Sequence, residues 1–173
     1  MDKKYCVPFV AAIVERQHQG RLQLLIQTRW NTKYQSIYNG TFEFAAGTLD
    51  IEYENVYTAV AREIKEETGM VLKRIIDDSQ TKVHSPQGVD AAFGFRPFCC
   101  TQQLREGRPW VGFIFRCEVE DGEPQDQAGE SLNVHWEDAT VVKQIYEETP
   151  EKLFTLELPA WDYYFQNVNT ESL

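Results

Sequence analysis

The stretch AREIKEETGM, residues 61–70, carries three glutamates, one arginine and a glycine in ten positions. Apolar residues recur every four positions through and before this stretch: Val56, Val60 and Ile64. This spacing is typical of one face of an α-helix. Asn55 is a suitable N-cap, and Gly69 stands where the residue after a helix belongs. The sequence therefore predicts a helix from about Asn55 to Thr68.

The three glutamates of this helix share one side of it. Projected at about 100° per residue, Glu63, Glu66 and Glu67 fall on an arc that borders the apolar face. One interpretation is a solvated surface with i,i+4 pairs such as Arg62 with Glu66. However, the carboxylates repel one another, and two of them lie in the last turn, where the helix dipole disfavours negative charge. Mg²⁺ or Mn²⁺ would compensate, since hard divalent cations prefer oxygen ligands.

REIKEETGM, Arg62–Met70, resembles the core of the Nudix box, Arg-Glu-apolar-x-Glu-Glu-x-Gly-apolar, at every position. The half of the box that precedes it departs from the family pattern. That pattern has five residues between its leading glycine and the next glutamate, whereas Gly47 and Glu54 enclose the six residues TLDIEY. We interpret the difference as a loop lengthened by one residue. Whether Glu54 keeps its place is left open.

The resemblance implies an α/β (α+β) fold, a Nudix-like α/β/α sandwich with a mixed β-sheet, in a single domain over residues 1–173. It implies Mg²⁺ (or Mn²⁺) as cofactor, with Gly47 adding its carbonyl as a ligand and Arg62 holding the glutamates in register. The metal ligands that it implies are Gly47, Glu63, Glu66 and Glu67. For the proton acceptor, Glu130 in AGESLNVHW resembles the position where many relatives place a glutamate. The alternative for Glu130 is an exposed loop acid.

The activity that the resemblance implies is metal-dependent hydrolysis of a nucleoside diphosphate linked to another moiety. EFAAG resembles the corresponding strand end of ADP-ribose pyrophosphatases, which also tend to carry a proline where this chain has Pro86. ADP-ribose or a related sugar nucleotide is therefore the leading substrate. Arg29, which ends QTRW, is a candidate phosphate ligand. Several aromatic residues are expected near the pocket, where one would stack on a base: Trp30, Tyr34, Tyr38 and Phe44.

Two alternatives stay open. The first is a pyrophosphohydrolase of a nucleoside or pterin triphosphate, which the aromatic polar loop NTKYQSIYNG would also suit. The second is a Nudix-fold module that senses a nucleotide without cleaving it. Such modules usually have an eroded box and a fused DNA-binding domain, whereas here the box is intact.

Composition limits the other classes of function. A chain of 173 residues is long enough for one domain with a proper core. The formal charge of -10, without a run of Lys or Arg, argues against nucleic acid as a partner. Four cysteines without CxxC spacing are expected to be reduced, as in a cytoplasmic protein. No apolar run approaches the length of a membrane span. A homodimer is left open, because many sugar-nucleotide relatives are dimers.

The rest of the sequence predicts further strands and two closing helices. ERQHQG and REGRP are expected to connect hairpins, with Gly20 at a positive φ in the first. The strands are expected at 7–14, 22–30, 41–47, 70–77, 95–103, 110–119 and 132–136, and the helices at 137–148 and 157–168.

Overall fold

A computed structural model describes residues 5–30, 37–107, 109–127 and 131–170. Its mixed sheet is built around strand β1 (Val7–His18), which runs parallel to β7 (Trp110–Val119). On its other side β1 pairs antiparallel with β4 (Ala45–Thr48) over its first half and with β2 (Arg21–Thr28) over its second half. The remaining strands extend the sheet beside β2 and β7: β3 (Phe42–Glu43), β5 (Leu72–Ile75), β6 (Cys99–Gln102) and β8 (Leu132–Asp138).

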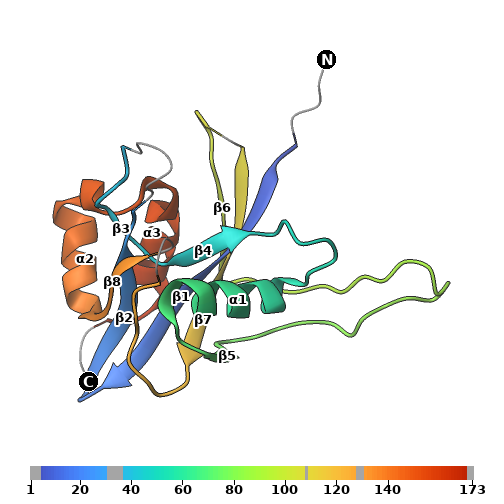
Figure 1. Cartoon of the computed structure of the whole chain (residues 1–173), viewed down its shortest axis with the longest axis horizontal. Helices are drawn as coiled ribbons and strands as arrows, with labels where there is room; N and C mark the ends of the chain where they lie inside the picture. The colour runs from blue at the N-terminus through green and yellow to red at the C-terminus, as the bar shows by residue number, and fades with distance from the viewer. Residues whose placement is uncertain (1–4, 31–36, 108, 128–130, 171–173) are drawn as a thin grey trace.

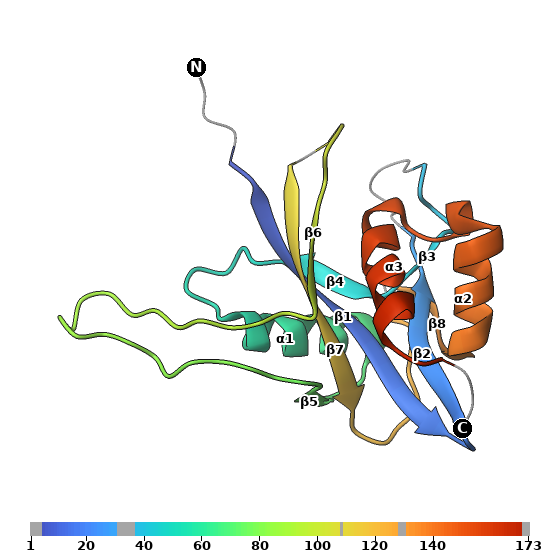
Figure 2. The same ribbon diagram turned by 180° about the vertical axis from the view of Figure 1, so that it is seen from behind.

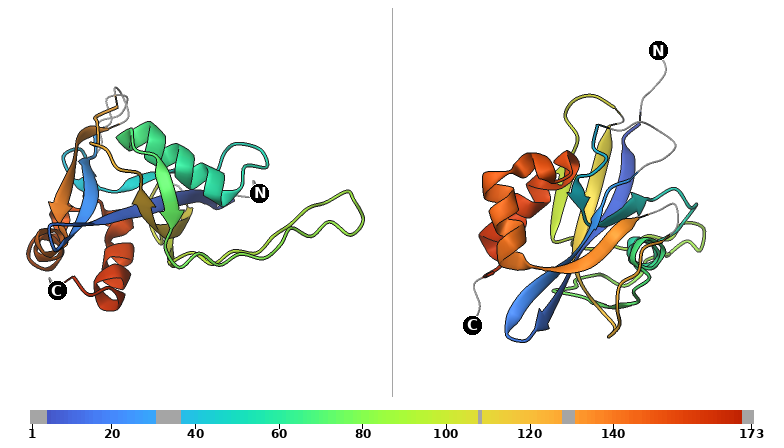
Figure 3. Two further views of the ribbon diagram at one scale, coloured as in Figure 1. Left: turned by 90° about the horizontal axis from the view of Figure 1, so that it is seen from below. Right: turned by 60° about the vertical axis from the view of Figure 1, so that its left-hand side comes forward.

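Helices cover both faces of the sheet (Figure 3). Helix α1 (Val56–Thr68) lies on one face, and α2 (Ala139–Glu148) and α3 (Leu158–Asn167) lie on the other. Alternate residues of β1 serve the two cores: Val10, Ala12 and Val14 pack under α1, whereas Ala11 and Ile13 pack under α2 and α3. This period of two is the expected behaviour of a strand that is buried on both sides. The predicted α/β/α sandwich with a mixed sheet is confirmed.

Both predicted hairpins are present. Gln19 and Gly20 connect β1 to β2 with φ values of 50° and 76°, and two successive positive φ values match the twist of a two-residue hairpin. The segment that contains REGRP likewise joins β6 to its antiparallel neighbour β7.

Helix α1 begins and ends where the sequence predicted. The Asn55 side chain accepts hydrogen bonds from the backbone N–H groups of Tyr57 (2.9 Å) and Thr58 (3.0 Å). Gly69 follows the last turn with a φ of 72° and donates to the carbonyl of Lys65. These caps satisfy backbone groups that a helix end would otherwise leave unpaired.

The predicted strand 41–47 is wrong as one element, because it divides into β3 and β4. β3 pairs with β2 and β4 pairs with β1, so the chain crosses between two parts of the sheet. Phe44 lies at the crossing and points into the core, where its ring meets Trp161 at a centroid distance of 5.1 Å. The second closing helix is also shorter than predicted, since a 3₁₀ turn, Thr155–Glu157, precedes α3.

A long extended arm, residues 77–98, projects from the body of the molecule (Figures 1 and 2). Two isolated bridges join its halves, Gln80 with Phe95 and His84 with Ala92. The strand predicted at 95–103 is shorter in the structure, where β6 begins at Cys99. The residues before Cys99 belong to the arm. Among the described residues, no helix has the length and apolar character needed to cross a bilayer.

Candidate active site

Arg62 forms hydrogen bonds with three acidic residues of the candidate site, Glu54, Glu63 and Glu66. Its guanidinium donates to both carboxylate oxygens of Glu54, from Nε at 3.1 Å and from Nη2 at 3.0 Å. Its Nη1 donates to Glu63 at 2.5 Å and to Glu66 at 3.1 Å. The hydrogen bonds to Glu54, with those to Glu63 and Glu66, hold the pKa of Arg62 well above its usual value. Glu54 therefore lies against Arg62 despite the lengthened loop.

Gly47 and Glu63 lie in unusually close contact. A Cβ atom built on Gly47 would lie 2.0 Å from the carboxyl carbon of Glu63 and 2.0 Å from its Oε1. Any side chain at position 47 would therefore displace this carboxylate. The glycine brings the β4 backbone directly against the glutamate, which is the arrangement that a shared metal ligand set would need.

Glu67 has hydrogen-bond partners different from those of Glu63 and Glu66. Its Oε2 accepts hydrogen bonds from Gln27 Nε2 at 2.8 Å and from the backbone N–H of Ala46 at 3.1 Å. Burial, followed by repulsion from Glu43, raises the pKa of Glu67 well above its ordinary value. Burial likewise raises the pKa of Glu63, against the opposing effect of Arg62.

The three glutamates of α1 make two different sets of contacts. Glu63 and Glu66 both contact Arg62, but Glu67 turns towards β2 and β4. Within the residues that the structure describes, no three His, Cys, Asp or Glu side chains already converge as metal ligands. The carboxylate oxygens of Glu63 and Glu66 still fit a hard divalent cation. Both carboxylates contact the same nitrogen of Arg62, and Glu63 lies against Gly47. Together they carry two negative charges, whereas the guanidinium carries one positive charge.

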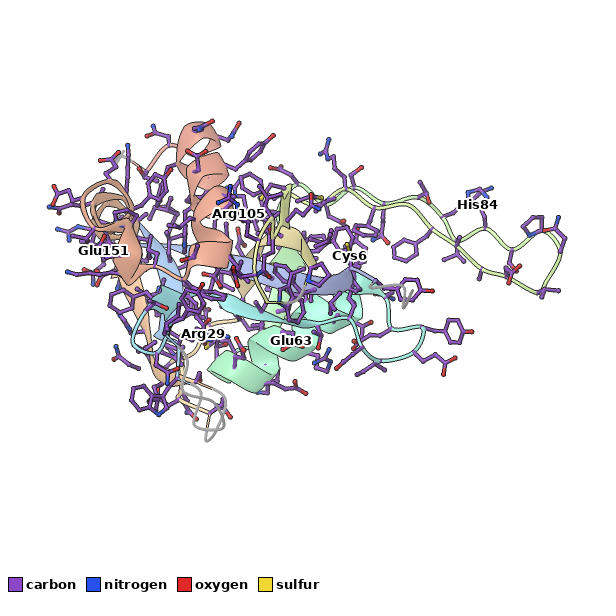
Figure 4. The ribbon with its side chains drawn as sticks, turned by 90° about the horizontal axis from the view of Figure 1, so that it is seen from above. Cys6, Arg29, Glu63, His84, Arg105 and Glu151 are labelled. Atoms are coloured by element: carbon purple, nitrogen blue, oxygen red, sulfur yellow. The ribbon has the colours of Figure 1, made fainter. Side chains whose placement is uncertain are left out.

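Arg29 lies near the same site, on the chain that leaves β2 (Figure 4). Its Nη1 pairs with Glu43 at 2.6 Å, and its guanidinium lies 4.2 Å from the centroid of the Phe154 ring. Burial raises the pKa of Glu43, and the charge of Arg29 opposes that shift. Arg29 also lines a cleft that borders Gly47, as a substrate-binding residue would.

Other predicted substrate residues lie elsewhere. Phe44 is 1% exposed in the core, and this burial does not fit a ring that stacks on a base. Pro86 belongs to the arm, two positions from His84, which Figure 4 shows far from Glu63. A contact between Pro86 and the site is therefore not formed within one chain. Trp30 is half-exposed, and Tyr38 packs edge-on against Phe154. Glu130 and Tyr34 lie outside the described residues.

Three residues of this region were not predicted from the sequence. Gln27 holds Glu67, Glu43 holds Arg29, and Glu157 accepts a hydrogen bond from the backbone N–H of Phe44 at 3.0 Å. Glu43 stands within TFEFAAG, where a glutamate in an otherwise apolar strand end was the available signal. Glu157 gave no such signal, because an acid before LPAW is typical of the ordinary start of a helix.

Comparison with known proteins identifies the family and the fold. The model of the family described as NUDIX domain matches residues 7–157. A search of curated proteins found no match. Among solved structures, the NUDIX domain of Shewanella oneidensis NrtR complexed with ADP ribose has a TM-score of 0.67 at 15% identity, over 96% of this chain and 91% of that chain.

Two further solved structures share the fold. The E. coli ORF135 protein has a TM-score of 0.59 at 21% identity, with 94% of this chain and 91% of that chain covered. A C. elegans Ap4A hydrolase binary complex has a TM-score of 0.55 at 14% identity, with 94% of this chain and 99% of that chain covered.

Proposed function

This chain belongs to the NUDIX domain family and is a pyrophosphohydrolase, and from that premise we propose that it hydrolyses a nucleoside diphosphate linked to another moiety, with Mg²⁺ or Mn²⁺ as cofactor. The observation that carries the proposal is the contact set of Arg62, which joins Glu54, Glu63 and Glu66. These residues stand beside Gly47, and a cleft large enough for part of a substrate borders that glycine.

Each residue of the site has a role in this proposal. Glu63, Glu66 and Glu67 would hold the cation, with the carbonyl of Gly47, and Arg62 keeps Glu63 and Glu66 within reach of one another. A bound divalent cation supplies positive charge that neutralises the diphosphate oxygens and makes water a better nucleophile. Glu130 is the proposed proton acceptor. Arg29 is the proposed phosphate ligand, since its guanidinium lines the cleft.

ADP-ribose or a related sugar nucleotide is the leading substrate in this proposal. The resemblance of EFAAG to ADP-ribose pyrophosphatases supports it, and the NUDIX domain of Shewanella oneidensis NrtR shares the fold and is complexed with ADP ribose. Pro86 gives no further support, because it lies on the arm. The second candidate is a nucleoside or pterin triphosphate, which the aromatic polar sequence NTKYQSIYNG would also suit.

The test is hydrolysis of a substrate panel in Mg²⁺ or Mn²⁺: ADP-ribose, other sugar nucleotides, nucleoside triphosphates and dihydroneopterin triphosphate. We expect a nucleoside monophosphate to be released from one sugar nucleotide, and Glu66→Gln to lose most of that activity. Glu147→Gln, on the exposed face of α2, is the matched control. Release of pyrophosphate from a triphosphate would favour the second candidate. Turnover of nothing in the panel, or equal turnover by Glu66→Gln, would contradict the enzyme proposal.

A further inference from the structure

The cleft beside Gly47 has a volume of about 150 Å³. Its lining combines aromatic rings, backbone of β4 and two charged residues: Phe9, Arg29, Ala46, Gly47, Thr48, Trp110, Phe154, Leu156 and Glu157. A cavity of roughly this volume accommodates one six-membered ring. The cleft therefore suits a single ring system and is too small for a whole dinucleotide.

Aromatic residues form the walls of this cleft. Phe9 on β1 and Trp110 on β7 meet edge to face, with centroids 6.0 Å apart at 87°. Gly112 makes room for the first of these rings, since a Cβ atom at Gly112 would lie 2.2 Å from Phe9 Cζ. Phe154 stands beneath the guanidinium of Arg29. Walls of this kind favour a flat, partly apolar ligand.

Glu157 lines the same cleft and carries an unpaired polar atom. The residue is 3% exposed, and its Oε2 accepts the hydrogen bond from Phe44 N. Its Oε1 is buried and has no hydrogen-bond partner among the described residues, and the same holds for Nε of Arg29. An unsatisfied buried polar atom costs about 1–3 kcal/mol. Two such atoms on residues that line one cleft indicate that a ligand completes their hydrogen bonds.

We propose that this cleft seats the planar heterocycle of the substrate and that Glu157 hydrogen-bonds to the polar edge of that ring. The inference rests on the proposed function and adds to it the residue that recognises the ring. The aromatic walls favour the ring, and Gly47, which lines the cleft, lies directly against Glu63 of α1. The ring therefore enters the cleft, and the diphosphate lies towards Gly47 and the glutamates of α1.

The protonation of Glu157 defines what it recognises. Burial, followed by repulsion from Glu43, raises the pKa of Glu157 well above its ordinary value, which favours the neutral acid. Because Oε2 already accepts from Phe44 N, the proton belongs on Oε1. Glu157 then donates a hydrogen bond, and the complementary atom on the ring is an acceptor, such as a ring nitrogen or a carbonyl oxygen.

The test is calorimetric titration, in Mg²⁺ buffer, of the protein with AMP, GMP, CMP, UMP and neopterin. Ribose 5-phosphate is the probe without a nucleobase. At least one heterocyclic probe is expected to bind 10-fold or more tightly than ribose 5-phosphate. Glu157→Leu should weaken its binding about 10-fold, which corresponds to one hydrogen bond. Glu157→Gln should bind like the wild type, because its amide can present an N–H where Oε1 stands.

The matched control is Glu151→Leu, since Glu151 is an exposed glutamate on the 3₁₀ turn Pro150–Lys152. Trp110→Ala is a second variant, which tests the cleft even if Glu157→Leu fails to fold. It should also weaken binding of the ring. Equal binding of all probes and ribose 5-phosphate would overturn the inference. So would wild-type affinity in both Glu157→Leu and Trp110→Ala, or a loss in Glu157→Gln as large as that in Glu157→Leu.

Failure of this inference differs from failure of the proposed function. A protein that binds a heterocyclic probe through Glu157 but hydrolyses nothing in the panel would support the ring subsite and contradict the proposed activity. Hydrolysis of a sugar nucleotide with the same kcat/KM in the wild type and in Glu157→Leu would support the proposed activity and contradict the ring subsite.

Discussion

A Cβ atom on Gly47 would overlap the carboxyl group of Glu63, at 2.0 Å from its carboxyl carbon. The two residues come from β4 and α1, so this contact fixes the distance between the strand and the helix at the proposed metal site. The backbone at Gly47 does not have a positive φ, so space alone excludes a side chain here.

We predict that Gly47→Ala lowers kcat/KM by about 100-fold or more, because a displacement near 1 Å at a catalytic group has effects of that size. The measurement is steady-state hydrolysis of the best substrate. Gly122→Ala is the matched control, since a Cβ atom there would meet Met70 only at an ordinary contact distance of 3.7 Å. Similar losses in the two variants would show that the close approach to Glu63 is irrelevant.

The pair Arg62–Glu54 should be strongly coupled. Its side chains are 22% and 6% exposed, and two hydrogen bonds join them. A double-mutant cycle with Arg62→Gln and Glu54→Gln is expected to give a coupling of about 1–3 kcal/mol in the free energy of unfolding. The exposed pair Arg74–Glu118 provides the comparison cycle and should couple much more weakly. Equal coupling in both cycles would contradict the prediction.

Stability of the metal-free protein should depend on pH through Glu157. Its pKa is raised in the folded protein, so the folded state binds a proton more tightly than the unfolded state does. The resulting stability is fully present below the unfolded pKa of about 4.3 and is lost as pH rises towards the folded pKa. Urea unfolding in EDTA should therefore show the wild type losing stability relative to Glu157→Gln as pH rises above about 4.3. Parallel curves for the two proteins would rule this out.

Thiol reactivity should follow burial. All four cysteines are free, and burial raises the pKa of Cys99 to about 12. The nucleophilic thiolate is then scarce at a pH of about 8. We expect iodoacetamide to modify the exposed Cys6 first and Cys99 only after unfolding, as read by peptide mass spectrometry. Rapid modification of native Cys99 would show that the pKa or the burial is different in solution.

Glu130 remains a prediction from the sequence as the proton acceptor. If it fills that role, Glu130→Gln should lower kcat by about 10²–10⁴-fold with little change in KM. Glu120→Gln, at an exposed glutamate directly after β7, is the control. An unchanged kcat in Glu130→Gln would assign the proton transfer to another residue.

The sequence predicted the parts of this fold that depend on local signals. Helix α1 carries its own N-cap, periodicity and terminal glycine, so its bounds needed no knowledge of neighbours. The β1–β2 hairpin was equally local, since Gly20 marks its turn. The Nudix-like core motif named Arg62 and the three glutamates before any geometry was known.

The remaining features depend on contacts between distant segments. Phe44 N and Glu157 are 113 positions apart, and no periodicity joins them. The hydrogen bond that Glu67 accepts likewise depends on Gln27, which belongs to β2. The arm was not predicted for a different reason: its two halves meet at isolated bridges and not in a continuous ladder, which leaves little pattern in the sequence.

The parallel pairing of β1 with β7 has a consequence for biosynthesis. Glu15 on β1 and Arg116 on β7 form two hydrogen bonds across 101 positions of the chain. Such distant pairing loses the entropy of closing a long loop before any contact offsets that loss, and this slows folding. During synthesis, the edge of β1 that pairs with β7 therefore stays unpaired until β7 has been translated, and an unpaired strand edge favours aggregation during that interval.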